Sequence, residues 1–271
     1  MPVISRITTQ KKNNQRYNIF LQEGKNERFA FSVDESILVE YRLRKGLEIS
    51  DSVIEAIQKK DETYKFYIQA INFLSYRMRS RKEVFTYLKK KEASFEQIEQ
   101  VLERLEKEKL IDDEQFARMF VQSRINTTSK GPMLIKKELL EKGISSAIAE
   151  RALDQYTEEL QYKKITAFFE KKKKSRKKVS YRKQLDQWKT NLLQKGFPMD
   201  MIQQAAADLD ENMDEEKEWE ALVYQGEKLK RKHEGKLSGY ALRNKVKEGL
   251  YRKGFPMDMI QQFTDKMDDE Y

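Results

Sequence analysis

The chain has 271 residues, 37% of them charged and 38% hydrophobic, with a formal net charge of +9 and no cysteine. This apolar share argues against a disordered chain, and the absence of cysteine excludes disulfides, thiolate metal sites and cysteine nucleophiles. No apolar run reaches the roughly 18 residues of a membrane span, and "MPVISRITTQ" does not resemble a signal peptide. We therefore expect a cytoplasmic protein that contacts no membrane.

The N-terminal segment differs from the rest of the chain. "VISRITT", "RYNIFLQ" and "RFAFSV" are rich in β-branched and aromatic residues and are separated by turn-forming stretches, which predicts a three-stranded meander up to about Val33. Asp34 then begins a helix that ends at Gly46, and a longer helix runs from about Ser50 to Ser75. Residues 1–49 form either a cap on the helical part or a separate contact module.

An internal repeat dominates the remainder. The decapeptide "KGFPMDMIQQ" occurs at Lys195–Gln204 and again, unchanged, at Lys253–Gln262. Glycines or their counterparts recur at Glu92, Gly143, Gly196 and Gly254, at spacings of 51, 53 and 58 residues. One apolar position of the following segment is in register across the four copies, at Ile98, Ala149, Ile202 and Ile260. A pattern that recurs at similar spacings is the signature of a repeat protein.

The decapeptide combines the end of one helix with the start of the next. Gly143, Gly196 and Gly254 supply the left-handed conformation that ends a helix, and a capping residue or proline follows. In the first copy, "SFEQ" forms a capping box from Ser94 to Gln97. We expect Phe197 and Phe255, with Met201 and Met259, to pack inside the corner. A third helix follows in each full copy.

These patterns predict a mainly α fold. Tandem three-helix repeats would form an elongated curved rod, with a small N-terminal antiparallel β-meander. The expected divisions are 1–49 (N-terminal cap), 50–126 (first repeat with its lead-in helix), 127–178 (second repeat), 179–236 (third repeat) and 237–271 (partial fourth repeat).

No residue set favours catalysis. Asp112 and Asp113 could hold a metal as paired carboxylates, but a helix cap and a first-turn acid explain them better. His233 stands among "KRKHEG" without an acid–base or metal-binding partner nearby, and "SKGPMLIKK" lacks phosphate-loop spacing. We predict no catalytic residue, no cofactor and no metal site, and hence no enzyme.

Three segments in sequence resemble the RecX family, the bacterial regulators of the RecA recombinase. They are "YRMRSRKEVFTYLKKK", "LIDDEQFARMFVQSR" and "KGPMLIKKELLEKGISSAIAERAL", and the resemblance is strongest from Tyr67 to about Lys173. It implies tandem three-helix repeats and a non-enzymatic function. Such proteins bind the RecA–single-stranded DNA filament, along its helical groove, and inhibit ATP hydrolysis and strand exchange. The resemblance thus implies a monomeric RecA inhibitor acting in recombination, DNA repair and the SOS response.

Basic residues are the candidate contacts with such a filament. The segment from Arg77 to Lys91 has seven Lys or Arg against one acid, and Lys163 to Lys183 has eleven against one. Cations of this kind bind phosphates without sequence preference, although an acidic patch on RecA is an equally good target. The predicted contact residues are Arg77, Arg79, Arg81, Lys89, Lys90, Arg124, Lys130, Lys136 and Lys137. The Lys171–Lys178 run is either a second basic contact or a solvated insert.

Two other functions stay open at this point. A stand-alone single-stranded nucleic-acid-binding repeat protein would show aromatic side chains among surface cations. Most aromatic residues here fall on apolar helical stripes instead, which favours the core. A nuclease or other enzyme is the third possibility, and no residue set supports it.

Overall fold

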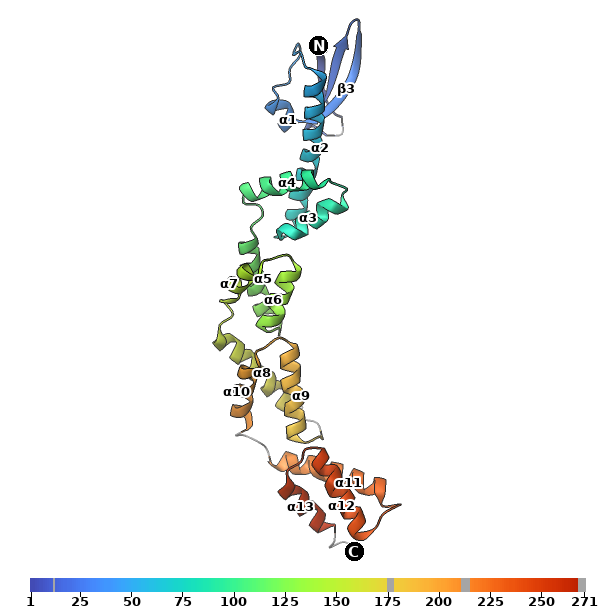
Figure 1. Cartoon of the computed structure of the whole chain (residues 1–271), viewed down its shortest axis with the longest axis vertical. Coiled ribbons are helices and arrows are strands. Elements are labelled where there is room, and N and C mark those ends of the chain that lie inside the picture. The colour runs from blue at the N-terminus through green and yellow to red at the C-terminus, as the bar shows by residue number, and fades with distance from the viewer. Residues whose placement is uncertain (12, 175–177, 211–214, 268–271) are drawn as a thin grey trace. The chain divides into compact units, whose positions relative to one another are not determined.

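The computed structural model describes residues 1–267 except residues 12, 175–177 and 211–214 (Figure 1). Over these residues the chain forms three strands and thirteen helices. It divides into two compact units, Met1–Phe116 with Lys142–Ile144, and Ala117–Glu141 with Ser145–Tyr271. Each unit has hydrophobic clusters of its own. The mainly α fold with an N-terminal sheet is therefore confirmed, and the curved rod stays a prediction.

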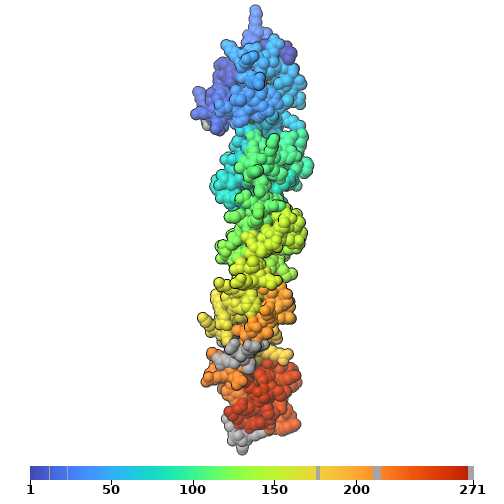
Figure 2. Space-filling view, turned by 90° about the vertical axis from the view of Figure 1, so that its left-hand side faces the viewer, coloured from blue at the N-terminus to red at the C-terminus, as the bar shows by residue number. Residues whose placement is uncertain are grey.

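The N-terminal sheet is an antiparallel meander in the order β1-β2-β3, as the sequence predicts. Its strands are β1 (Val3–Thr9), β2 (Arg16–Glu23) and β3 (Asn26–Asp34). Ile19 pairs with Ile7 on one side and with Phe31 on the other. The apolar face is covered by α1 (Glu35–Glu40) and α2 (Asp51–Leu74), and these elements lie together in the space-filling view (Figure 2).

A buried carboxylate ties this sheet to α2. Asp61 is only 2% exposed and accepts hydrogen bonds from Arg16 Nη2 at 2.7 Å and from the backbone N–H of Asp34 at 2.9 Å. Asp34 in turn caps α1 by accepting from the Ser36 N–H. Because a buried charge is costly unless it is paired, Asp61 and Arg16 specify how the sheet packs on α2.

The first helix is shorter than predicted. It ends at Glu40 instead of near Gly46, because Arg42 adopts the left-handed conformation with φ 48°. The Leu43 N–H then donates to Leu38 O at 3.0 Å, and the Leu43 side chain is buried against the sheet. Burial of this leucine ends the helix before the glycine. The longer helix α2 agrees with its prediction and is capped by Ser50.

The remaining helices form pairs joined by tight corners, and each pair follows a longer helix. The pairs are α3 (Arg81–Lys90) with α4 (Phe95–Lys107), α6 (Pro132–Glu141) with α7 (Ser146–Leu153), α9 (Tyr181–Gln194) with α10 (Met199–Asp210), and α12 (Gly239–Arg252) with α13 (Met257–Lys266). The longer helices that precede them are α2, α5 (Asp113–Thr127), α8 (Glu158–Lys174) and α11 (Glu215–His233).

Packing follows this grouping. One hydrophobic cluster joins the second half of α2 with α3 and α4, and another joins α11 with α12 and α13. Helix α8 packs against α9 and α10. The apolar position shared by the four copies is at most 1% exposed in each, at Ile98, Ala149, Ile202 and Ile260. The repeat register that the sequence predicts is therefore confirmed. The proposed repeat boundaries, which begin at the pairs, stay a prediction.

The corners adopt the backbone conformation that their glycines permit. Gly143, Gly196 and Gly254 have φ angles of 85°, 86° and 85°. Glu92, which stands in place of glycine in the first copy, also has a positive φ of 66°. Phe197 and Phe255 are 1% and 3% exposed, which confirms that the repeated rings pack inside the corners.

Each Lys–Gly corner also contacts the start of a helix from earlier in the chain. The carbonyl of the corner lysine accepts a hydrogen bond from the residue that precedes that helix. The three bonds run from Ser80 Oγ to Lys142 O at 2.7 Å, from Gly131 N to Lys195 O at 2.7 Å, and from Ser180 Oγ to Lys253 O. We call this arrangement the corner bond. In both copies of the decapeptide, and also at Lys142 and Gly143, the lysine and glycine therefore make the corner and its contact.

The corner requires glycine for two reasons, which are the positive φ angle and the lack of room for a side chain. A Cβ added at Gly196 would lie 2.5 Å from the Leu134 backbone nitrogen, whereas one added at Gly239, with φ 50°, meets nothing within 4 Å. Gly239→Ala should therefore cost only about 1–2 kcal/mol, the strain of a left-handed alanine. Gly196→Ala should cost about 1–3 kcal/mol more, because overpacking is added to that strain.

Urea unfolding followed by the fluorescence of Trp188 and Trp219 measures both variants, since these residues and both glycines belong to the second unit. Equal losses of stability for Gly196→Ala and Gly239→Ala would show that the close approach at the corner contributes nothing.

Candidate functional site

The three arginines predicted before the first pair are engaged within the first unit. Arg77 Nη2 lies 2.9 Å from Glu83 Oε1. Arg81 pairs with two carboxylates of α4, with Nη2 at 2.6 Å from Glu99 and Nε at 2.8 Å from Glu106. The Arg79 guanidinium lies 4.0 Å above the centre of the Phe73 ring. Two of these arginines are therefore neutralised, and Arg81 links α3 to α4.

Glu83 is the centre of a second group of contacts. Its carboxylate accepts from Arg77, from Lys142 Nζ at 2.8 Å and from the Ser80 backbone N–H at 3.3 Å. Burial alone would raise the pKa of Glu83, but the hydrogen bonds from Arg77, Lys142 and Ser80 outweigh it and lower the pKa to about 2. The charged carboxylate thus holds the corner at Lys142 against the start of α3.

Lys89 and Lys90 have a different environment. They lie in the last turn of α3, where cations favour the negative end of the helix dipole, and both are exposed. Within the part of the chain that the structure describes, neither makes an ion pair or a side-chain hydrogen bond. They are therefore available to an external anion.

The predicted residues of the second unit are mostly paired. Arg124 Nε donates to Glu138 Oε2 at 2.8 Å, and Lys130 contacts the other oxygen of the same carboxylate. Lys136 pairs with Glu150 at 2.7 Å. Lys137 is exposed on α6 and, among the described residues, has no ion pair. Arg124, Lys130 and Glu138 thus join the end of α5 to α6.

The nine predicted contacts therefore fall into three classes. Arg77, Arg81, Arg124, Lys130 and Lys136 are in ion pairs, Arg79 lies on Phe73, and Lys89, Lys90 and Lys137 are exposed. Those up to Lys90 belong to the first unit and the others to the second. Their use in binding stays a prediction.

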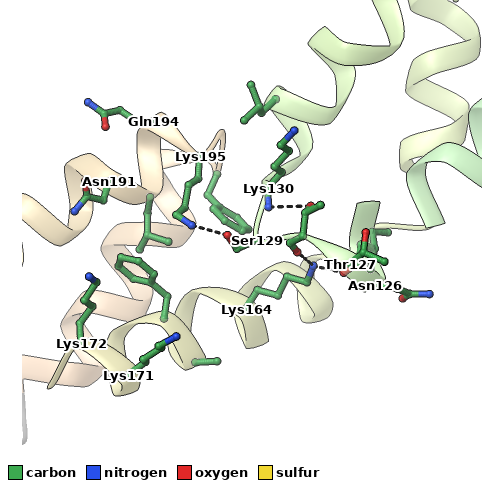
Figure 3. Close-up of a pocket in the computed structure, with 17 residues that line it drawn as sticks. Asn126, Thr127, Ser129, Lys130, Lys164, Lys171, Lys172, Asn191, Gln194 and Lys195 are labelled. Atoms are coloured by element: carbon green, nitrogen blue, oxygen red, sulfur yellow. Dashed lines mark hydrogen bonds between the residues drawn. The ribbon is translucent and has the colours of Figure 1, made fainter. Parts of the chain in front are cut away.

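A hollow in the second unit brings together cations that the sequence predictions did not group. It has a volume of about 970 Å³ and lies between the α5–α6 loop, α8 and the corner that follows α9 (Figure 3). No carboxylate is among its lining residues. The lysines that line it are Lys130, Lys164, Lys171, Lys172 and Lys195. We call this surface the lysine hollow.

Two of these lysines are held by hydrogen bonds. Lys164 Nζ donates to the carbonyls of Ile125 and Thr128, the latter at 2.9 Å, near the end of α5. Burial lowers the pKa of Lys164. Lys195 Nζ donates to Ser129 Oγ at 2.5 Å (Figure 3). The α5–α6 loop therefore orients both ammonium groups.

An aromatic ring lies among these cations. Phe168 of α8 lines the hollow and is partly exposed. The ammonium groups of Lys195 and Lys172 lie 5.6 and 5.7 Å from the centre of its ring. The negative face of the ring therefore attracts both ammonium groups.

Sequence reasoning found only part of this surface. Lys130 was predicted as a contact, and Lys171 belongs to a basic run that was considered separately. Lys164 lies in the run from Lys163 to Lys183 that was counted as basic but was not among the predicted contacts. Lys195 was missed, because only the fold brings it beside these lysines. The available signal was Lys195 itself, the first residue of the repeated decapeptide.

The paired acids Asp112 and Asp113 act as helix caps. Asp112 Oδ1 accepts the Gln115 N–H at 2.9 Å, and Asp113 Oδ1 accepts the Arg81 N–H at 2.9 Å. Burial raises the pKa of Asp113. The described residues contain no cluster of three or more groups able to hold a metal ion.

The fold and this surface define a tandem three-helix repeat protein with an N-terminal sheet and a basic hollow. Four family models match the chain. They are the regulatory protein RecX N-terminal domain at residues 2–50 and the first, second and third three-helix domains of RecX at residues 67–105, 112–153 and 215–264. The chain belongs to the RecX family.

Full-length relatives agree with this assignment. Regulatory protein RecX of Oceanobacillus iheyensis is 52% identical over 267 residues, which cover 98% of each chain. Regulatory protein RecX of Halalkalibacterium halodurans is 45% identical, with 97% of this chain and 99% of the relative covered. No helix in the described part of the chain combines the length and the apolar character needed to cross a bilayer.

Solved structures show the same fold. A crystal structure of a regulatory protein RecX aligns with a TM-score of 0.67 and 32% identity, covering 75% of this chain and 98% of that one. RecX from Lactobacillus salivarius aligns with a TM-score of 0.53 and 37% identity, covering 56% of this chain and 99% of the other.

The depressed pKa of Glu83 predicts a pH-dependent stability. A carboxyl group whose pKa falls from 4.5 to about 2 on folding stabilises the protein above its unfolded value, and this stabilisation is lost as the pH falls toward 2. Glu83→Gln should therefore cost at most roughly 3 kcal/mol at neutral pH, since one pKa unit is worth about 1.4 kcal/mol. The difference from wild type should shrink steadily below about pH 4.

Urea unfolding followed by circular dichroism between about pH 7 and about pH 3 measures this difference. Glu96→Gln is the control, because Glu96 and its partner Lys59 are both 62% exposed and such pairs contribute little. A Glu83→Gln penalty that does not change with pH would contradict the assignment of the depressed pKa to this carboxylate.

Proposed function

We propose that this chain binds RecA filaments formed on single-stranded DNA and inhibits their ATP hydrolysis and strand exchange. In this way it regulates recombination, DNA repair and the SOS response in the cytoplasm. The observation that carries the proposal is the match to regulatory protein RecX over 98% of both chains, together with all four RecX domain models.

The surface charge supports this proposal. A RecA filament presents both a protein surface and the phosphates of its bound strand, and a partner that contacts phosphates needs cations without internal carboxylate partners. Among the described residues, Lys89, Lys90 and Lys137 meet that condition, as do Lys164, Lys171 and Lys195 of the hollow. The proposed function requires no catalytic group, and the adjacent acids Asp112 and Asp113 are explained as helix caps.

A stand-alone nucleic-acid-binding function is the second candidate, because Phe168 and the lysines of the hollow form a small platform of the kind that binds single strands. An assay that contains RecA separates the two functions. A stand-alone binder affects RecA only by occupying the DNA, so it should not change RecA activity while the single-stranded DNA is in excess.

The test is the RecA ATPase rate on single-stranded DNA in excess, with this protein titrated in. We expect the rate to fall as protein is added, and the inhibition to weaken as the salt concentration rises, because released counterions drive phosphate binding. An unchanged ATPase rate at saturating protein would contradict the proposed function.

Charge reversal tests the exposed candidate contacts. Lys89→Glu, Lys90→Glu and Lys137→Glu, combined, should raise the concentration needed for half inhibition by about tenfold or more, as phosphate contacts are lost. The matched control reverses three exposed lysines elsewhere, Lys228, Lys232 and Lys236. Arg81 and Arg124 are unsuitable for reversal, because a glutamate there would face Glu99 or Glu138 and destabilise the fold.

A further inference from the structure

We propose that the lysine hollow binds single-stranded nucleic acid directly, with its lysines on backbone phosphates and Phe168 stacked on an unpaired base. The inference rests on the proposed function, because it assigns a strand-binding role to one surface of the second unit. The residues that carry it are Lys164, Phe168, Lys171 and Lys195.

Three lysines of the hollow have no carboxylate partner in the part of the chain that the structure describes. Lys130 is neutralised by Glu138, but Lys164, Lys171 and Lys195 form no ion pair with any described residue. None of the described residues that line the surface has a carboxylate. Several ammonium groups that share one hollow repel one another, so an external anion with several charges lowers their energy.

A comparison of two corners shows that this imbalance is local. At the first corner, Lys142 pairs with Glu83, which stands three residues after Ser80, the donor of the corner bond. At the second corner, the residue three after the donor Gly131 is Leu134. Lys195 therefore lacks the carboxylate that its counterpart Lys142 has, and it turns to Ser129 and Phe168.

The lysines are also held in place before any ligand arrives. Lys164 is fixed by two carbonyls at the end of α5, and Lys195 by Ser129. Ordering a long side chain costs free energy on binding, so cations that are already oriented bind more tightly than freely moving ones. Lys89 and Lys90 of α3 have no such support among the described residues.

The lining favours a nucleic acid over an acidic protein surface. Phe168 is a partly exposed ring on which a base can stack, and such stacking is a main source of affinity for single strands. Asn126, Asn191 and Gln194 also line the hollow and can each donate to and accept from base edges. An acidic helix would satisfy the lysines but would leave the ring and these amides without a matching group.

The test measures binding of a fluorescein-labelled oligodeoxythymidine by anisotropy, in the absence of RecA, at several salt concentrations. Lys171→Glu with Lys195→Glu should weaken binding by about tenfold or more and reduce the salt slope by about 1.4, because each phosphate contact contributes about 0.7 on single strands. Phe168→Leu should weaken binding by about fivefold or more through lost stacking. Lys164 is left intact, because its ammonium group satisfies carbonyls of the fold.

The matched control is Lys228→Glu with Lys232→Glu, which makes the same change in net charge on the exposed face of α11. It should leave the affinity within about twofold of wild type, since distant exposed charges are screened by salt. Circular dichroism checks that all variants are folded, and the neutral pair Lys171→Gln with Lys195→Gln repeats the test without introducing acids.

Three outcomes separate this inference from the proposed function. Equal losses of oligonucleotide binding in the hollow variant and the control overturn the inference, because only net charge would matter. A wild type that inhibits RecA without binding the oligonucleotide, while the hollow variant loses inhibition, also overturns it and assigns the hollow to an acidic protein surface. A wild type that binds the oligonucleotide through the hollow but does not inhibit RecA supports the inference and contradicts the proposed function.

Discussion

The hydrogen bond accepted by the carbonyl of each corner lysine is the interaction on which the helical repeats depend. It forms only where the corner approaches an earlier helix closely, and a Cβ at Gly143 would lie 2.5 Å from Lys82 Cβ. Glycine therefore has two functions, since it permits the positive φ and leaves room for the neighbouring helix. Glu92 shows the contrast. It takes the same φ region in the first copy, and among the described residues no donor from an earlier helix reaches the carbonyl of Lys91.

The first backbone N–H of the contacted helix also donates a hydrogen bond to a carboxylate from another element. Asp113 accepts the N–H of Arg81, the first residue of α3, and the buried Glu218 accepts the N–H of Tyr181, the first residue of α9. Helix α6 begins with Pro132, which has no N–H, so the same need does not arise there. Different residue types thus meet one constraint, which is that buried polar groups at helix ends must find partners.

The sequence predicted these features unequally, for a physical reason. Glycine corners, the capping box at Ser94 and the apolar register are local, so the sequence specifies them directly, and all are present. Ion pairs depend on distances that only the fold determines. Arg81 is neutralised by Glu99 and Glu106, which lie 18 and 25 residues further along the chain. A run of arginines therefore looks like a binding surface in the sequence, although much of its charge holds helices together.

These ion pairs also change which positive charges are the best candidates for contacts with a ligand. The family resemblance favoured the region from Arg77 to Lys91. The run from Lys163 to Lys183 has the larger local charge, but its part from Lys171 to Lys178 has little apolar patterning to suggest a fixed surface. The structure shows that a cation's availability depends on its nearest carboxylate, not on the number of its basic neighbours. Lys195 illustrates this, because Leu134 stands where the first corner has Glu83, and Lys195 has no ion pair with any residue that the structure describes. Two copies of one structural unit therefore place the same lysine in different electrostatic environments, with a carboxylate partner at Lys142 and a hydroxyl partner at Lys195.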